Sequence, residues 1–481
     1  MAHSSAVRET DMADQLVAIE LVSCHLIITR DAHSEILLVQ EGSSLRLPRV
    51  EIPMWERAAP HLISTVRELW GVDAICLFNA DIGDNDSKPT NVRCYVLEAM
   101  YLGAVPKGGG VWVSTEARDA AGLRSMGDFV RIQKALSQAT AYDRKELVGP
   151  FAHSGWFKEL TSWIESQLST HGWRLGGEWS QYNMGPSFCL IHAATNGPGV
   201  WFKAVGKPNL KEYAITCALN QLRSSYLPQI LATHDEWHGW LALEISGHRL
   251  DGILDIRHWK NAASSLAAMQ LESLGSTEAL LSAGCKDLRL GHLDSLIDPL
   301  IELFAELMKK QCVNPPRILT KHELNILGDA LHRTCDRLQS LGFVDTLGHR
   351  DLNPGNVIVN ADRAVFLDWA EGMIGHPFFT FEYLIALLRS LRPDLEHWTA
   401  HLREGYARPW RNTYLEEKIR EAFLVTPLLA VLAFAASSSG WQENPHEMDQ
   451  YRAKLMRSLA RRMYAEACKF ESNRFLFSIS S

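Results

Sequence analysis

The sequence predicts an α+β protein with two lobes, in which strand-rich segments precede helical ones. Two observations carry this prediction. Up to about residue 250, short apolar runs rich in β-branched residues alternate with turns, whereas apolar residues beyond it recur mainly at helical spacing. A strand–loop–strand segment at 346–369 then interrupts the helices. Strands first, and then helices with an embedded hairpin, are typical of a bilobal α+β architecture.

The first part of the chain reads as mixed strands and turns. Residues 1–14 are expected to be a flexible N-terminus, and a first domain is expected at 15–140. Its candidate elements are strands at 17–28, 35–39 and 92–100 and a helix at 59–70. Around 140–154 the pattern becomes polar and irregular, which indicates a domain boundary.

The second part divides into a small lobe at 150–246 and a large lobe at 247–475. The small lobe begins with an aromatic helix near Trp156. Its further candidates are strands at 188–193, 200–205 and 240–245 and a helix at 210–222. Helices of the large lobe are expected at 258–274, 296–311, 321–341, 379–391, 414–436 and 447–468.

Composition excludes several classes of protein. A chain of 481 residues exceeds what one hydrophobic core usually organises, so two or three domains are expected. A net charge of -8 leaves no surplus of Lys and Arg for nucleic-acid phosphates, and we expect no nucleic-acid partner. The nine cysteines include no CxxC pair, which argues against a disulfide framework or a zinc site and for a reducing cytosol.

The sequence also argues against export and against a membrane partner. Residues 1–14 are too polar and acidic for a secretory signal. The longest apolar run, 422–436, is too short to span a bilayer and contains Pro427, so we expect a buried helix there. We therefore predict a cytoplasmic protein, and the oligomeric state stays open.

The segment that carries chemistry reads His349-Arg-Asp351-Leu-Asn-Pro-Gly-Asn356, followed by two short apolar runs and Asp368. The apolar runs, with a turn between them, predict a hairpin that brings Asn356 and Asp368 close together. Two oxygen ligands on strand ends suit Mg²⁺, which binds through one or two carboxylates and substrate phosphates. Asp351 is left to accept a proton from an attacking hydroxyl.

This pattern, His-x-Asp-x-x-x-x-Asn and then apolar-apolar-Asp-Trp, resembles the signature of the aminoglycoside phosphotransferase and choline kinase superfamily. The resemblance covers about residues 150–470 and implies a protein-kinase-like fold. It implies that Asp351 is the catalytic base, that Asn356 and Asp368 bind Mg²⁺, and that His349 braces the loop. The reaction implied is transfer of a phosphoryl group from ATP or GTP to a hydroxyl of a small molecule, an antibiotic or a metabolite. The helices after Gly372 would build the acceptor pocket.

The resemblance also assigns the nucleotide-binding residues. The fold needs a Lys on a strand to contact the phosphates and a Glu on the next helix to hold that Lys. Lys203 lies in an apolar run, and Glu212 follows on the next predicted helix. Glu244 and Ile245 resemble the segment between the lobes, whose backbone receives the adenine. Ser187 is expected in the loop that covers the nucleotide.

Three positions depart from the family pattern. His376 and Thr380 stand where the family usually has Asp, after a glycine and three residues after Pro377. Gln270 stands where the family often has His. These departures leave the nucleotide site intact, but they leave the subfamily and the acceptor open.

The first domain resembles a degenerate Nudix fold. Arg67 and Glu68 match part of the Nudix box, but the next acidic pair is missing, and Trp70 and Gly71 follow too soon. Because one Glu cannot assemble the usual metal site, we predict a non-hydrolysing module that recognises a ligand, packs or forms an interface.

Three other functions compete with a small-molecule kinase. The first is a nucleotide-binding regulatory protein without transfer activity, against which the retained Asp351 argues. A protein kinase is disfavoured because no Ala-Pro-Glu ending follows Asp368. A Nudix hydrolase with an accessory kinase-like domain is disfavoured by the missing glutamates.

Overall fold

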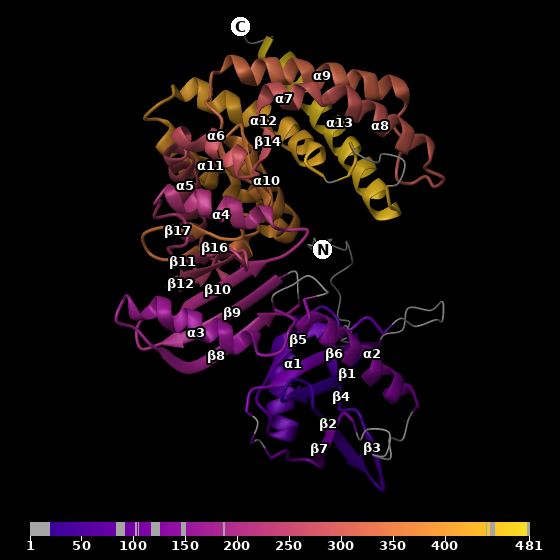
Figure 1. The fold of residues 1–481 in the computed structure, drawn as a ribbon. Coiled ribbons are helices and arrows are strands. Elements are labelled where there is room, and N and C mark those ends of the chain that lie inside the picture. The colour runs from indigo at the N-terminus through magenta and orange to yellow at the C-terminus, as the bar shows by residue number, and fades with distance from the viewer. Residues whose placement is uncertain are drawn as a thin grey trace. The chain divides into compact units, whose positions relative to one another are not determined.

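The computed structural model describes residues 20–82, 92–101, 103, 105–116, 126–145, 151–185, 188–438, 440–442 and 448–478. The chain forms two compact units. We call them the N-terminal unit, which comprises Thr10–Tyr213 and Ile230–Glu244, and the C-terminal unit, which comprises Ala214–Gln229 and Ile245–Ser481. The N-terminal unit holds the two larger sheets and the C-terminal unit is mainly helical, so the predicted α+β class is confirmed (Figure 1). The domain boundaries given above stay a prediction.

The first sheet has seven strands, with β3-β2-β1-β6-β5 as its main order. Its strands are β1 Leu21–Arg30, β2 Glu35–Glu41, β3 Ser44–Arg46, β4 Arg49–Pro53, β5 Ala74–Asn79, β6 Val92–Ala99 and β7 Gly110–Ser114. The central strand β1 is buried on both faces, because a helix covers each side. Leu26 of β1 shares a core with α1 (Ala58–Trp70), whereas Ile27 shares one with α2 (Met126–Asp143).

The second sheet has five strands in the order β11-β12-β10-β9-β8. Its strands are β8 Leu175–Asn183, β9 Phe188–Thr195, β10 Val200–Val205, β11 Ile230–His234 and β12 Gly239–Leu243. The helix α3 (Trp156–Ser169) packs on this sheet, and α4 (Lys211–Gln221) follows β10 in the chain. β10 is paired on both sides, so the middle of the sheet holds its side chains rigidly.

The two sheets of the N-terminal unit share one hydrophobic core. Its buried members come from the first sheet, from α2 and α3, and from the second sheet. Where the edge strands β5 and β8 approach each other, the side-chain amide of Gln181 accepts from the backbone N of Cys76 and donates to its carbonyl O, both at 2.9 Å. The first domain is therefore packed onto the second sheet and is not a separate body on a linker.

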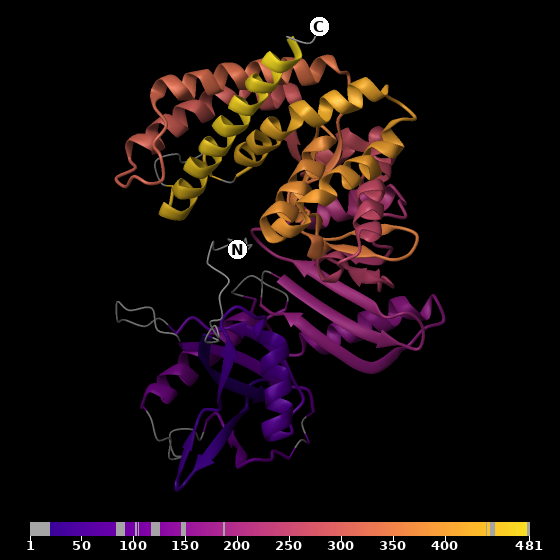
Figure 2. The same cartoon turned by 180° about the vertical axis from the view of Figure 1, so that it is seen from behind.

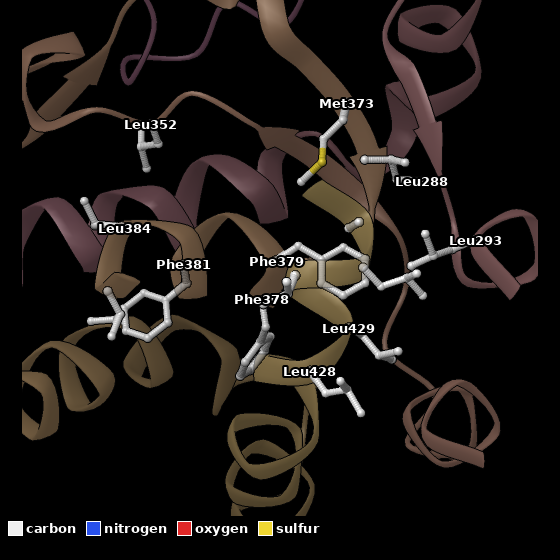
Figure 3. Close-up of a cluster of buried hydrophobic side chains, with 14 of the residues drawn as sticks. Leu288, Leu293, Leu352, Met373, Phe378, Phe379, Phe381, Leu384, Leu428 and Leu429 are labelled. Carbon is white, nitrogen blue, oxygen red and sulfur yellow. The ribbon is translucent and has the colours of Figure 1, made fainter. Parts of the chain in front are cut away.

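The C-terminal unit is built around one large core. Its main helices are α5 Ile256–Glu272, α8 Ile297–Lys309, α9 Lys321–Ser340, α10 Phe378–Leu391, α11 Thr399–Trp410, α12 Glu416–Ala436 and α13 Gln450–Ser478. The long helix α13, yellow in Figures 1 and 2, packs beside α12. Figure 3 shows part of this core, with Leu352, Met373 and Phe378 among the labelled side chains.

The apolar run at 422–436 belongs to a longer helix than its own length suggested. At 21 residues, α12 is long and apolar enough to cross a membrane, which corrects the argument from the length of the run. Of its most apolar window, 67% is buried inside the protein, as in a core helix. The expected buried helix is thus observed, and burial rather than length is the reason.

Candidate active site

The segment that the sequence pattern singles out, residues 346–369, contributes strands to two small sheets of the C-terminal unit. It runs from β15 (Thr346–His349) through a short turn of helix at Pro354–Asn356 to the hairpin of β16 (Val357–Val359) and β17 (Ala364–Phe366). The backbone N of Leu367 donates to the carbonyl O of Asn356 at 2.8 Å. Asn356 and Asp368 are therefore held at the same end of the hairpin, as the sequence pattern indicates.

Asp368 has a backbone conformation that a non-glycine residue rarely adopts. Its φ is 62°, in the left-handed region. Such strain costs about 1 to 3 kcal/mol and is typically retained where a side chain must be aimed in one direction. The short β17 strand before Asp368 and the buried Trp369 after it fix the backbone on both sides.

His349 holds the loop from inside and has one defined tautomer. It is fully buried, and its Nδ1 accepts a hydrogen bond from the backbone N of Asp351 at 3.1 Å. Its Nε2 therefore carries the proton and donates to the carbonyl O of Leu367 at 3.0 Å. Burial lowers the pKa of His349, so the ring is neutral. The imidazole thus ties the loop that carries Asp351 to the strand end before Asp368.

Asp351 faces the solvent at the surface of the C-terminal unit. Partial burial of the carboxylate disfavours its charge and raises the pKa of Asp351, and the Asp368 carboxylate contributes in the same direction. Tyr383 of α10 donates from its hydroxyl to Asp351 Oδ1 at 3.3 Å. Asn356 Nδ2 donates to the Asp351 carbonyl O at 3.1 Å. The carboxylate is thereby held with one oxygen bound by Tyr383.

Thr380 explains one departure from the family pattern. Its hydroxyl accepts a hydrogen bond from the backbone N of His349 at 2.9 Å, and it is fully buried. The neighbouring Gly348 leaves room for this contact, because a Cβ there would lie 2.8 Å from Thr380 Oγ1. A neutral hydroxyl therefore satisfies the buried backbone N–H of His349.

His376 and Gln270 fill buried positions beneath the site. His376 lies among aromatic rings such as Phe343, and burial lowers its pKa to about 3, so it is neutral. Gln270 donates to the carbonyl O of Pro377 at 2.8 Å and accepts from the hydroxyl of Tyr406 at 2.6 Å. Both departures are therefore accommodated as packing and hydrogen-bonding groups.

An ion pair that the sequence does not predict supports the loop that carries Asp351. Arg350 contacts Glu371 at 3.1 Å and donates to the carbonyl O of Ser437 at 2.8 Å. Tyr383, Arg350 and Glu371 all interact with Asp351. Sequence spacing carries no signal for them, since each contact joins segments whose pairing depends on the fold.

Lys203 and Glu212 form an ion pair in the N-terminal unit. Lys203 lies on the central strand β10, and its ammonium donates to Glu212 Oε1 at the start of α4. Both side chains are largely buried, at 14% and 5% exposed. The rings of Phe188 and Trp240 flank the ammonium at 5.1 and 5.7 Å. A buried Lys needs such a partner, and Glu212 supplies it.

Two of the remaining residues predicted to bind nucleotide, Glu244 and Ile245, follow the end of β12 (Gly239–Leu243). Glu244 directly follows β12; its backbone N donates to the carbonyl O of Gly199 at 2.8 Å, and its side chain is 3.3 Å from His192. Ile245 is half-buried and comes next in the chain. Ser187 lies outside the described residues.

The donor set of the hairpin end fits a hard divalent cation. The Asn356 amide nitrogen is held by the Asp351 carbonyl, which leaves its amide oxygen as the group to meet a metal ion beside the Asp368 carboxylate. In the part of the chain that the structure describes, no group of three or more His, Cys, Asp and Glu side chains is placed to hold a metal. The pair instead fits binding through few protein ligands together with phosphate oxygens.

The partial Nudix box lies on α1 and the turn after it. Arg67 pairs with Asp73 at 2.5 Å, and Glu68 is exposed. Gly71 ends α1 in the left-handed conformation, with φ of 65°. The resemblance of this domain to the Nudix fold stays a prediction.

Comparisons with known proteins point to one family. Residues 208–421 match the model described as the phosphotransferase enzyme family. A search of curated protein sequences gives no match. Among solved structures, a macrolide 2′-phosphotransferase from Brachybacterium faecium is similar at 14% identity and a TM-score of 0.40, over 63% of this chain and 98% of that chain.

Two further solved structures are similar at the same level. The ethanolamine kinase of Plasmodium vivax has 15% identity and a TM-score of 0.41, over 61% of this chain and 84% of that chain. The choline kinase of Streptococcus pneumoniae has 16% identity and a TM-score of 0.39, over 64% and 99%. Such distant likeness leaves the acceptor unassigned. Residues 208–421, somewhat less than half of the chain, are thus similar to the phosphotransferase enzyme family.

Proposed function

We propose that this protein transfers the γ-phosphoryl group of ATP or GTP to a hydroxyl group of a small molecule, with Asp351 as the base. The observation that supports this most is the arrangement around Asp351, whose loop is held by His349 and whose carboxylate is bound by Tyr383. The match to the phosphotransferase family covers this segment.

The proposed reaction is an in-line displacement. The acceptor oxygen forms a bond to the γ-phosphorus, the bond from that phosphorus to the β–γ bridging oxygen breaks, and the nucleoside diphosphate leaves. The hydroxyl proton passes to Asp351, whose second carboxylate oxygen is not taken by Tyr383. Most of the rate comes from positioning and from charge stabilisation.

Two sets of residues are proposed to bind the donor. Lys203, held by Glu212, neutralises phosphate charge, and the backbone at Glu244 and Ile245 binds the base. Asn356 and Asp368 would hold Mg²⁺, which supplies charge neutralisation on the phosphates when bound. Most cysteines, among them Cys24, Cys76 and Cys189, are buried, in keeping with the proposed cytoplasmic location.

A regulatory protein that binds nucleotide without transferring phosphate is the competing function. It has no use for a base that is fixed as firmly as Asp351. The first experiment is a thermal-shift measurement with ATP–Mg²⁺ and GTP–Mg²⁺ on the wild type and on Asp368→Ala. We expect metal-dependent stabilisation in the wild type and its loss in the variant.

The base is tested separately by Asp351→Asn, which keeps the shape of the side chain. We expect this variant to retain nucleotide stabilisation and to lose phosphoryl transfer by at least a hundredfold, the usual contribution of a general base. Transfer at an undiminished rate would remove Asp351 from the mechanism. Nucleotide binding without turnover on any hydroxyl compound would favour the regulatory function.

A further inference from the structure

A cavity of 530 Å³ lies within the C-terminal unit, among α10, α11, α12 and α13. This volume is within the range of pockets for small organic ligands. Its walls are mostly apolar and aromatic, and they include Ala386, Leu387, Phe423, Leu424, Pro427, Leu428, Ala430, Val431, Phe434, Leu455 and Leu459. The cavity therefore favours a ligand with a large apolar part.

One side chain connects this cavity to the proposed base. Tyr383 lines the cavity, and its hydroxyl donates to Asp351 Oδ1 at 3.3 Å. Its ring is stacked on Phe434, another lining residue, with 5.8 Å between centroids. A ligand seated against this aromatic wall has one end next to Tyr383, whose hydroxyl binds the Asp351 carboxylate; Asp351 itself is not among the residues that line the cavity.

The charged lining residues have an excess of cations. Four are basic, Arg389, Arg403, Arg462 and Lys469, and two are acidic, Glu382 and Glu466. Each acid already has a basic neighbour in the lining: Lys469 donates to Glu466 at 2.9 Å, and Arg403 lies 3.6 Å from Glu382.

Two guanidinium groups remain after this pairing. Arg389 is 3.5 Å from Glu396, an exposed residue that does not line the cavity. Arg462 has no carboxylate within ion-pair distance in the described part of the chain, although its charge and that of Arg389 act at longer range on Glu382. A cationic ligand would meet repulsion here, whereas a carboxylate could pair bidentately with a guanidinium group.

Glu382 does not reverse this balance. Its side chain is 5% exposed, and within the described part of the chain its Oε1 has no hydrogen-bond partner. Burial raises its pKa to about 7, so near neutral pH it is a hydrogen-bonding group with only part of a negative charge. Arg403 Nε is likewise buried without a hydrogen-bond partner among the described residues. Two polar atoms of the cavity lining, Glu382 Oε1 and Arg403 Nε, could therefore hydrogen-bond to a ligand.

We infer that the phosphoryl acceptor binds in this cavity and is a largely apolar hydroxy compound that carries an anionic group, such as a carboxylate, rather than a cationic one. The anionic group lies toward Arg462 and Arg389, and the hydroxyl lies toward Tyr383 and Asp351. The identification of this ligand as the phosphoryl acceptor rests on the proposed function, whereas its chemical class follows from the residues that line the cavity.

The test compares three probes that differ in one terminal group: ω-hydroxydodecanoate, its methyl ester and ω-aminododecanol. Binding to the full chain is measured by calorimetry without nucleotide, and transfer is then measured with ATP–Mg²⁺. We expect the carboxylate to bind at least about tenfold more tightly than the other two, as one well-placed ion pair allows. In Arg462→Gln this preference should fall to about the level of the ester. Lys454→Gln, an exposed change on the same helix outside the cavity, should leave it intact.

Tightest binding of the amine, binding of none of the probes, or a preference that survives in an Arg389→Gln/Arg462→Gln double variant would overturn the inference. The two proposals fail separately. Phosphorylation of the amine in preference to the acid would retain the kinase and reject the anionic acceptor. Tight Arg462-dependent binding of the acid, with nucleotide binding but no transfer to any hydroxyl, would retain the ligand class and reject the kinase mechanism.

Discussion

Thr380 satisfies the buried backbone N–H of His349 with a neutral hydroxyl. In Thr380→Val the shape is kept but this N–H loses its partner, which costs about 1 to 3 kcal/mol for a buried donor. We expect the melting temperature of the C-terminal unit to fall. We also expect phosphoryl transfer to slow, because the loop that carries Asp351 begins at His349. The measurements are calorimetry and the turnover rate.

The matched control is Thr380→Ser, which retains the hydroxyl. It should recover most of the stability and activity that Thr380→Val loses. Equal losses in the two variants would mean that the methyl group, and not the hydrogen bond, matters at this position.

Glu382 makes the stability of the C-terminal unit depend on pH. Burial raises its pKa from 4.5 to about 7, so the folded state keeps a proton that the unfolded state releases between these values. The free energy of unfolding therefore falls as pH rises from about 4.5 to 7, by about 3 kcal/mol at most. The melting temperature of the wild type minus that of Glu382→Gln should be smaller at pH 8 than at pH 5. A constant difference across this range would contradict the assignment.

Single residues show how far the sequence alone could reach. The placement of Asn356 and Asp368 at one end of a hairpin was predictable, because a hairpin is a local structure and its register follows from two short apolar runs. Tyr383 was not, since its contact with Asp351 depends on how α10 packs beneath the loop. An aromatic residue in a helix looks the same in sequence whether it fills the core or binds a carboxylate.

At the scale of elements, one side chain, that of Gln181 on β8, forms hydrogen bonds to the edge of β5. Gln181 is 2% exposed and occupies both the N–H and the C=O of Cys76. In Gln181→Leu these two buried groups lose their partners, so we expect the N-terminal unit to lose about 2 kcal/mol or more. Its melting transition reports the loss. Gln133→Leu, at an exposed position of α2, should have little effect.

Elements also show why domain packing could not be predicted. The apolar stripe of α1 and the alternating strands identify which faces are buried. They do not identify the partner, because any apolar face fits the pattern equally well. No sequence pattern indicates the core that the two sheets of the N-terminal unit share; the polar stretch 140–154 predicts only a domain boundary.

For the whole molecule, the large core of the C-terminal unit is separate from the cores of the N-terminal unit. We expect two unfolding transitions in calorimetry. Leu331→Ala and Leu160→Ala each remove a fully buried leucine, one from each unit, at a cost of about 2 to 5 kcal/mol. Each variant should lower one transition and leave the other unchanged. A single transition that responds equally to both would mean that the units unfold together.

The order of the chain does not follow the order of the units. Ala214–Gln229 belongs to the C-terminal unit but stands between the two stretches of the N-terminal unit in the sequence. The carbonyl O of its Tyr226 accepts a hydrogen bond from the backbone N of Phe366, in the hairpin of β16 and β17, at 2.9 Å. On a ribosome, the roughly 240 residues after Glu244 take on the order of 10 to 50 s to follow. During that time Ile215 and Leu219 have no core to join, which makes this stretch a natural client for chaperones. For the same reason, a gene split after Glu244 would yield a second fragment that lacks part of its own interior.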